Sequence, residues 1–339
     1  MKTQAIVPAQ LEWSAQGLPF AAAFDDVYHP VDGAPAQARH VFLAGNGLPE
    51  RWRGRDRFVV LETGFGLGNN FLATWDAWRR EGGPCRLHFI SIEQHPLTRA
   101  AMASLPRDPA LAPLAAQLAQ AWPPLTPNLH RLGFEDGRVE LLLALGDVTA
   151  WLPELVASVD AFYLDGFAPA KNPAMWQPRV FKALGRLAAT GATAATWTAA
   201  RAVREGLDAA GFEVRLAPGR GGKRDITLAR YAPAFTPRRA PARLGASAAG
   251  VQHAVVIGAG LAGCAAASAL AQQGWASTVL DRQAAPAQGS SGNPAGIFHG
   301  IINPQDGAHA RFNRAAALEA QRAVRQAIDR SGVDGGVDG

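Results

Sequence analysis

The 339-residue chain is predicted to have an α/β fold, a doubly wound and mostly parallel sheet followed by a second, incomplete βαβ unit. Three observations predict this. Short apolar runs alternate with helix-like segments through the first two thirds of the chain, as in doubly wound proteins. A glycine-rich turn follows an apolar run at residues 61–69 and again at residues 257–263. The stretch before the second turn has no periodicity.

The strands of the first unit are predicted from runs that are apolar almost throughout, because strands buried on both faces of a parallel sheet do not alternate. These runs are RFVVLE (57–62), RLHFISIE (86–93), RVELLLALGD (138–147), VDAFYLD (159–165) and GATAATWT (191–198). Helices are expected between them, for example over residues 70–80 and 176–189. GFEVRLA (211–217) and DITLARY (225–231) would form a closing hairpin at the sheet edge.

The chain is predicted to hold two domains, since 339 residues of 48% apolar content can bury two ordinary cores. Residues 232–250 are rich in Pro, Ala, Gly and Arg, a composition typical of a linker. We therefore expect a first domain over residues 1–235, a linker over 236–250 and a second domain over 251–339.

The composition excludes several classes of protein. Only Cys85 and Cys264 occur, so a disulfide framework and a thiolate metal site are excluded, and we expect a cytoplasmic protein without a metal. No sustained apolar segment marks a secretory signal at the N-terminus. The longest uncharged stretch, residues 254–271, is mostly Ala and Gly, so no membrane span is expected. A monomer is expected.

Positive charge gathers in residues 215–243, where eight basic residues accompany one acid, Asp225. This density suits a surface that follows a phosphate backbone, and it equally suits a merely solvated surface.

The first glycine turn contains Gly64, Gly66 and Gly68, a G-x-G-x-G spacing rather than the G-x-G-x-x-G spacing of dinucleotide sites. Glycines let the backbone pass closely beneath a ligand, where a Cβ would collide. Glu62, just before the turn, would repel a phosphate but attract the ammonium or sulfonium of S-adenosyl-L-methionine. A purely structural turn is the alternative.

Three acids, Glu62, Glu93 and Asp147, stand at the carboxyl ends of successive strands. Glu93 can accept both ribose hydroxyls of a nucleoside, and Asp147 can accept the adenine amino group. Each acid alone would more often be a surface residue. Together with the glycine turn, they converge on the crevice where open α/β sheets bind ligands, and predict a Rossmann-like S-adenosylmethionine-dependent methyltransferase.

The fourth strand leads into YLDGFAPAKNPAMW, which places Asp165 and Phe167 near a strand end. Amino-methyltransferases need a carboxylate that orients the attacking amine and an aromatic face that favours a cation. The alternative is that Asp165 only caps a helix beginning near Ala168.

Six segments resemble, in order, the methyltransferase half of the bifunctional tRNA 5-methylaminomethyl-2-thiouridine biosynthesis proteins. They are FDDVYHP, ARHVFLAGNGLPERW, LETGFGLGNNFLATW, EQHPLTRAAM, YLDGFAPAKNPAMW and AARAVREGLDAAGFEVR, within about residues 11–231. The resemblance implies that S-adenosylmethionine is bound by Glu62, Gly64, Gly66, Gly68, Glu93 and Asp147. It implies that Asp165 and Phe167 face the methyl acceptor, the aminomethyl nitrogen of the wobble uridine of a tRNA. The expected contacts to anticodon-stem phosphates are Arg220, Lys223 and Arg224, with Phe167 or Trp176 stacking an unpaired base.

The second glycine turn has the G-x-G-x-x-G spacing at Gly258, Gly260 and Gly263, and Asp281 follows at a strand end. A strand before it, an Ala-rich helix after it and an acid about 20 residues on are the context that a dinucleotide site requires. The loop GSSGNPAG (289–296), which contains Ser291, is of the kind that flavin oxidases wrap around FAD. FAD is therefore favoured over NAD.

About 90 residues form this second domain, which in the resembled family is an FAD-dependent oxidase half several times longer. We therefore predict a truncated oxidase half whose FAD binding is in doubt and which performs no oxidase turnover. Two alternatives are a flavin-dependent oxidoreductase with a scaffold N-terminal domain and a noncatalytic RNA-binding module.

Overall fold

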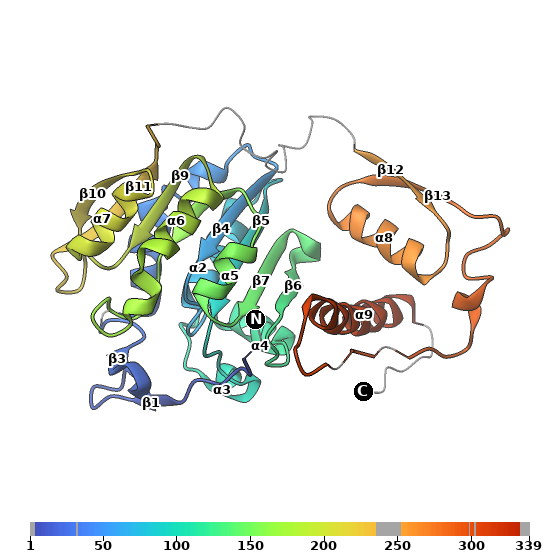
Figure 1. Cartoon of the computed structure of the whole chain (residues 1–339), viewed down its shortest axis with the longest axis horizontal. Helices are drawn as coiled ribbons and strands as arrows, with labels where there is room; N and C mark the ends of the chain where they lie inside the picture. Colours follow the sequence, from blue (N-terminus) through green and yellow to red (C-terminus); the bar gives the residue numbers. More distant parts are fainter. Residues whose placement is uncertain (1–3, 32, 235–251, 298, 302, 333–339) are drawn as a thin grey trace. The chain divides into compact units, whose positions relative to one another are not determined.

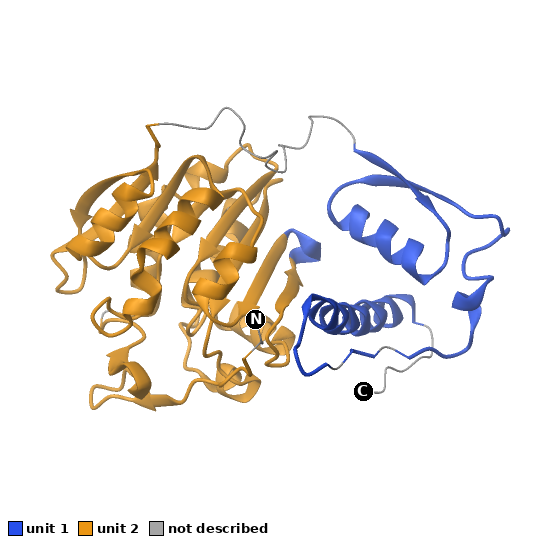
Figure 2. Cartoon of the chain, in the orientation of Figure 1, with its two compact units in different colours: residues 1–3, 135–138, 245–339 blue, residues 4–134, 139–244 orange. Residues whose placement is uncertain are grey.

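The computed structural model describes residues 4–31, 33–234, 252–297, 299–301 and 303–332. The chain divides into two compact units, coloured in Figure 2. The larger comprises residues 4–134 and 139–244, and the smaller comprises residues 1–3, 135–138 and 245–339. The expected linker over residues 236–250 lies outside the described residues.

The larger unit is built on an eight-stranded sheet with the strand order β10-β11-β9-β8-β4-β5-β7-β6. The five central strands pair in parallel, while β6 and β11 run antiparallel to their neighbours. This confirms the predicted doubly wound α/β fold with a closing hairpin. The bounds are β4 Arg57–Glu62, β5 Arg86–Glu93, β6 Leu129–Phe134, β7 Val139–Leu145, β8 Val159–Tyr163, β9 Ala188–Thr196, β10 Phe212–Pro218 and β11 Asp225–Tyr231.

Helices cover both faces of this sheet (Figure 1). Successive strand residues point to opposite faces, so that Val60 belongs to one buried cluster and Leu61 to the other. The first cluster includes side chains of α2, α4 and the segment η2, and the second includes side chains of α5, α6 and α7. The bounds are α1 Ala34–Gln37, η2 Ala38–Leu43, α2 Asn69–Glu81, α3 Arg99–Ser104, α4 Ala112–Ala121, α5 Val148–Glu154, α6 Pro178–Leu187 and α7 Arg201–Ala209.

A small antiparallel sheet near the N-terminus is the main element that the sequence analysis does not contain. It consists of β1 Leu11–Trp13, β2 Pro19–Ala21 and β3 Asp26–Val27. The hydrogen bond from Ala168 N to Asp26 Oδ2, 3.0 Å long, ties it to the loop that follows β8. The small sheet therefore lies at the carboxyl edge of the large one, where ligands bind in such folds.

The smaller unit contains the expected βαβ start. Strands β12 (His253–Ile257) and β13 (Ala276–Leu280) pair in parallel, and α8 (Leu261–Gln272) connects them. A long helix, α9 (Ala308–Ser331), follows. In the described ranges of both units, no helix is both long and apolar enough to cross a membrane.

Candidate active site

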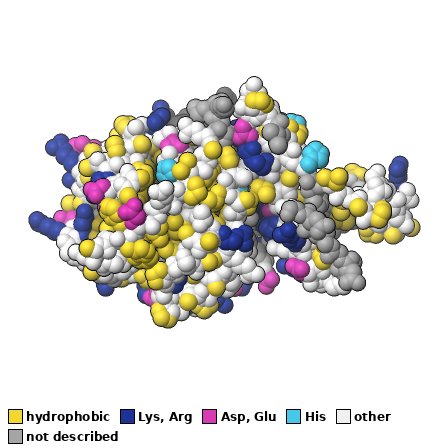
Figure 3. Space-filling view, turned by 90° about the horizontal axis from the view of Figure 1, so that it is seen from below, with side chains coloured by type: hydrophobic (Ala, Val, Ile, Leu, Met, Phe, Trp, Pro, Cys, Tyr) yellow, Lys and Arg dark blue, Asp and Glu magenta, His cyan; other side chains and the backbone are white. Residues whose placement is uncertain are grey.

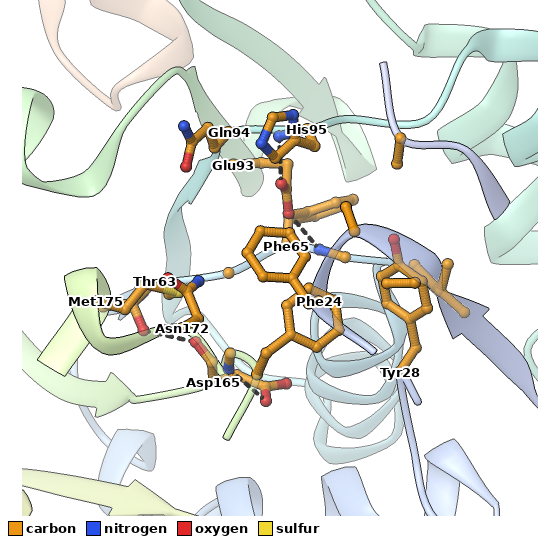
Figure 4. Close-up of a pocket in the computed structure, with 18 of the residues that line it drawn as sticks. Phe24, Tyr28, Thr63, Phe65, Glu93, Gln94, His95, Asp165, Asn172 and Met175 are labelled. Atoms are coloured by element: carbon orange, nitrogen blue, oxygen red, sulfur yellow. Dashed lines mark hydrogen bonds between the residues drawn. The ribbon is translucent and has the colours of Figure 1, made fainter. Parts of the chain in front are cut away.

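A pocket of about 290 Å³ opens at the carboxyl edge of the large sheet (Figure 4). Four parts of its lining follow the carboxyl ends of β4, β5, β7 and β8, where the sequence predicted a ligand site. A fifth part comes from the N-terminal segment. Its lining includes residues 63–67, 69 and 70 of the glycine turn, residues 92–95 after β5, Gly146 and Val148 after β7, residues 165–167, 172 and 175 after β8, and Phe24, Val27 and Tyr28.

The glycine turn runs in close contact with its surroundings. A Cβ on Gly64 would lie 3.1 Å from the carbonyl oxygen of Asp165, so the turn crosses directly over the end of β8. Gly68 has a φ of +76°, and a Cβ there would lie 2.9 Å from the ring of Phe65. At these positions glycine lets the turn pack against the rest of the protein. Gly64 and Gly66 line the pocket, whereas Gly68 is not among the lining residues.

We expect Gly68→Ala to destabilise the larger unit by on the order of 1–3 kcal/mol and to weaken S-adenosylmethionine binding. The reason is that alanine at this position would have both a strained backbone, with positive φ, and a Cβ that collides with the ring of Phe65. Gly82→Ala is the matched control, since Gly82 also has a positive φ, +56°, but no atom within 4 Å of the added Cβ. Urea unfolding and titration calorimetry measure both effects. Equal losses in the two variants would show that the collision at Gly68 is unimportant.

Backbone N–H groups donate hydrogen bonds to both carboxylate oxygens of Glu93 and so fix its side chain. Its Oε2 accepts a hydrogen bond from Gly66 N, and its Oε1 accepts one from His95 N, each 2.7 Å long. Because each carboxylate oxygen has two lone pairs, both oxygens can still accept a hydroxyl proton. Glu93 lines the pocket, so this geometry fits the expected ribose contact.

Asp147 is the N-cap of α5. Its Oδ1 accepts hydrogen bonds from Thr149 N at 2.7 Å and from Ala150 N at 3.2 Å. Its neighbours Gly146 and Val148 line the pocket, while Asp147 itself is not among the lining residues. The cap uses Oδ1, and the expected contact of Asp147 with adenine stays a prediction.

Glu62 requires a correction, because it does not reach the pocket. It is fully buried beneath the turn, where Ser91 Oγ donates to its Oε2 at 2.6 Å and Asn70 Nδ2 donates to its Oε1 at 2.9 Å. Burial, and then the charge of Asp165, raise the pKa of Glu62 to about 8. Glu62 is thus mostly protonated at neutral pH, and it supports Asn70 rather than contacting a cationic ligand directly.

Asp165 lies half-buried at the pocket wall. Its Oδ1 accepts a hydrogen bond from Gly166 N at 2.9 Å, and its Oδ2 accepts one from Asn70 Nδ2 at 2.6 Å. Burial is the main cause that raises the pKa of Asp165 to about 6, and these hydrogen bonds oppose it. No helix begins near Ala168 in this described part of the chain, because the next helical segments are a 3-10 helix over Pro173–Trp176, capped by Asn172, and α6 from Pro178. The alternative that Asp165 only caps such a helix is therefore wrong.

Asn70 is a site residue that the sequence analysis missed. Its side-chain nitrogen donates to both Glu62 and Asp165, so one amide joins the two carboxyl groups. The available signal was its position, the second residue of the helix that starts from the glycine turn.

An aromatic cluster stands beside Asp165. The ring of Phe167 stacks on Phe24, with centroids 4.6 Å apart, and meets the edge of Tyr28 at 5.4 Å. Trp176 Nε1 donates to the carbonyl of Phe167 at 3.1 Å and so holds this segment. In Figure 4, Glu93 and Asp165 stand on opposite sides of Phe24. Phe24 and Tyr28 belong to the segment FDDVYHP, which gave the resemblance but no predicted role.

The second glycine turn fits the pyrophosphate of a dinucleotide. Gly258 has a φ of +101°, and a Cβ on Gly263 would lie 1.8 Å from the carbonyl oxygen of Gly258, so strand and helix pack as the fingerprint requires. Gly260 is the N-cap of α8, and Leu261 N donates to Ser291 Oγ at 3.1 Å. Asp281 Oδ2 accepts from Ala259 N at 2.6 Å, and this hydrogen bond lowers the pKa of Asp281.

The three predicted RNA contacts, Arg220, Lys223 and Arg224, lie in the turn between β10 and β11. Since β10 runs in the same direction as β9 and β8, this turn is at the same edge of the sheet as the pocket. The basic residues of this stretch that follow residue 234, namely Arg238, Arg239 and Arg243, lie outside the described residues.

The comparisons with known proteins agree with this geometry. A family model for S-adenosyl-L-methionine-dependent methyltransferases matches residues 109–232, and one for FAD-dependent oxidoreductases matches residues 253–337. The tRNA 5-methylaminomethyl-2-thiouridine biosynthesis bifunctional protein MnmC of Methylibium petroleiphilum is 59% identical over 100% of this chain and 52% of its own length. That of Cupriavidus metallidurans is 53% identical over 95% of this chain and 48% of its own length.

A solved structure shares the fold. The crystal structure of MNMC2 from Aquifex aeolicus superposes with a TM-score of 0.57 and 21% identity, and the match covers 69% of this chain and 75% of that chain.

Fold, site and family models together define a methyltransferase domain that uses S-adenosyl-L-methionine, followed by part of an FAD-dependent oxidoreductase domain. The family models support both expected cofactors, S-adenosylmethionine for the first domain and FAD for the second. The chain belongs to the family of the tRNA 5-methylaminomethyl-2-thiouridine biosynthesis bifunctional proteins. It spans about half the length of the curated relatives that it matches.

Proposed function

We propose that the larger unit transfers a methyl group from S-adenosyl-L-methionine to the aminomethyl nitrogen of 5-aminomethyl-(2-thio)uridine at the wobble position of tRNA. The N–CH₃ bond forms as the S–CH₃ bond breaks, and the products are 5-methylaminomethyl-(2-thio)uridine and S-adenosylhomocysteine. One observation carries the proposal, namely that Asp165 and Phe167 line the same pocket as the glycine turn and Glu93. The names of the relatives, which specify tRNA 5-methylaminomethyl-2-thiouridine biosynthesis, support this acceptor.

The pocket residues suit the methyl donor along its length. Glu93 would accept the ribose hydroxyls, Asp147 would accept the adenine amino group, and the turn over residues 64–68 would carry the methionine part. When bound, S-adenosylmethionine supplies an electrophilic methyl group. The task of the protein is then to bring a neutral amine to it in the right orientation.

Asp165 would orient that amine. An alkyl ammonium with a pKa near that of lysine loses its proton at pH 7 only at a cost of about 4–5 kcal/mol. A neighbouring carboxylate raises the pKa of the amine further, so Asp165 is unsuited to the role of a strong base. It can instead accept a hydrogen bond from the amine, direct the nitrogen lone pair and receive the proton late.

Phe167, Phe24 and Tyr28 would form the wall against which the acceptor lies. Aromatic faces attract cations, and they stack on unpaired bases. Burial, and then the charge of Glu93, raise the pKa of Tyr28 to about 12, so its phenol stays neutral and can donate a hydrogen bond.

The deciding experiment is incubation of the chain with S-adenosylmethionine and tRNA from a strain that lacks this methylation, followed by nucleoside mass spectrometry. We expect 5-methylaminomethyl-(2-thio)uridine to appear only when both substrates are present. Binding of tRNA without any methylated nucleoside, and without heat of binding for S-adenosylmethionine, would favour a noncatalytic RNA-binding module instead.

For the smaller unit we propose binding of FAD through its pyrophosphate and ribose, by Gly258, Gly260, Gly263, Ser291 and Asp281. All residues that line the methyl-transfer pocket belong to the larger unit, so methyl transfer is expected without added FAD. Lack of oxidase turnover stays a prediction. A bound yellow chromophore together with peroxide production would favour the alternative, a flavin-dependent oxidoreductase with a scaffold N-terminal domain.

Replacing Arg220, Lys223 and Arg224 together by Gln should weaken tRNA binding and flatten its salt dependence. Each lost phosphate contact lowers the slope of log K against log salt by about 0.7–0.9. Filter binding at several salt concentrations measures this slope. The double variant Arg220→Lys, Arg224→Lys keeps the charge and should keep the slope. An unchanged slope in the triple Gln variant would place the RNA elsewhere.

A further inference from the structure

A second cavity, of about 470 Å³, adjoins the active-site pocket. Four residues line both, namely His29, Ala34, Leu67 and Asn69. The remaining lining comes from the β1–β2 hairpin, from Gly33, from α1, from Arg39 of η2 and from residues 105–108 and 111. A molecule that occupies the first pocket can therefore extend into the second without leaving the protein surface.

The inner wall of this cavity carries a partly buried cation, Arg107. Its Nη1 donates to Asn69 Oδ1 and its Nη2 donates to the carbonyl of Leu67, each at 2.9 Å. Burial lowers the pKa of Arg107 to about 10. No ion pair to a carboxylate is recorded for it among the described residues, and its Nε has no hydrogen-bond partner there. The one acid in the lining, Asp108, accepts a hydrogen bond from Ala110 N.

The rim carries a second cation and an aromatic ring. Arg39 is exposed at the cavity, and Trp13, on β1, is 51% exposed there. Guanidinium groups interleaved with exposed aromatic rings are typical of surfaces that hold single-stranded nucleic acid, where phosphates meet the cations and bases stack on the rings.

The rim also connects to the basic turn between β10 and β11. His40, next to Arg39, makes a 2.9 Å hydrogen bond between its Nε2 and the carbonyl of Pro218, the last residue of β10. This hydrogen bond brings η2, which carries Arg39, next to the end of β10, where the basic turn begins. Figure 3 shows Lys and Arg side chains at the left margin of this face, on the side where Figure 1 places β10 and β11.

We propose that the second cavity binds the RNA nucleotide next to the methyl acceptor, with a phosphate on Arg39 and Arg107 and the base against Trp13. This inference rests on the proposed function. The other anion available is the carboxylate of S-adenosylmethionine. A single carboxylate needs neither a second guanidinium group nor an exposed tryptophan beside it, whereas a polynucleotide uses both.

Two variants test the subsite, with full-length tRNA as the probe for affinity and with S-adenosylmethionine titrated separately. Arg39→Gln should weaken tRNA binding several-fold and lower the salt slope by about 0.7. Trp13→Ala should weaken binding about five- to tenfold or more with an unchanged slope, because stacking carries no charge. Both should leave the affinity for S-adenosylmethionine unchanged.

Arg57→Gln is the matched control, because Arg57 begins β4 at the opposite edge of the sheet and is exposed. It should change nothing. Parental tRNA affinity in both site variants would overturn the subsite. A lower affinity for S-adenosylmethionine in Arg39→Gln, with tRNA binding intact, would assign the cavity to the donor carboxylate and also overturn it. If the parent binds tRNA but transfers no methyl group, the proposed function fails, while the binding comparison still decides the subsite.

Discussion

Asp165→Asn is expected to lower the rate of methyl transfer about 10²–10⁴-fold, the range typical of a lost proton-accepting group, while S-adenosylmethionine affinity changes by no more than a few-fold. The physical reason lies in the hydrogen bonds of this side chain. Asp165 accepts from Asn70 and from Gly166 N on different oxygens, and a carboxylate still has lone pairs for the amine. An amide has only one accepting oxygen, so it cannot satisfy both neighbours and the substrate.

Single-turnover transfer of labelled methyl to tRNA measures this loss, and calorimetry measures donor binding. Asp208→Asn is the matched control, because Asp208 is exposed on α7. The pH profile gives an independent readout. Because the pKa of Asp165 is raised to about 6, the parental rate should fall as pH drops through 6, where the carboxylate gains a proton. Turnover of Asp165→Asn within a few-fold of the parent would refute the role of Asp165.

Glu62→Gln is expected to stabilise the larger unit above pH 8. Glu62 is fully buried, and its pKa is raised from an ordinary 4.5 to about 8. A raised pKa in the folded state means that the folded protein binds more protons than the unfolded chain between these values. The stabilisation by the neutral carboxyl is therefore complete below pH 4.5 and is lost as pH rises towards 8.

Glutamine cannot ionise, and it keeps both contacts, accepting from Asn70 and donating to Ser91 Oγ. At ~1.4 kcal/mol per pKa unit, the gain above pH 8 should be on the order of a few kcal/mol. Denaturant unfolding from pH 5 to pH 9 measures it, with Glu213→Gln on exposed β10 as the control. Parallel pH curves for Glu62→Gln and the parent would show that Glu62 is ionised in the folded protein.

The elements predicted most accurately are those with long, uniform patterns. Strands β4 and β5 have the predicted bounds, because continuous apolar runs between polar residues leave few alternatives. Strands β1 and β3 have three and two residues, too few to show a period, so the sheet that carries Phe24 and Tyr28 to the pocket was missed. Strand β6 was missed as well, since its sequence LHRLGF lacks the uniform apolar character of the central strands.

The sequence by itself determined the two glycine turns, the parallel sheet beneath the first and the set of acids at its strand ends. These follow from local rules of backbone freedom and strand burial. Tertiary structure alone decided what each acid does. Glu62 and Glu93 both end a strand, yet one points into the protein and is neutralised by burial, while the other points into the pocket and is held by backbone amides. Exposure and charge depend on what packs against a side chain, and residues distant in sequence, such as Asn70 against Asp165, provide that packing.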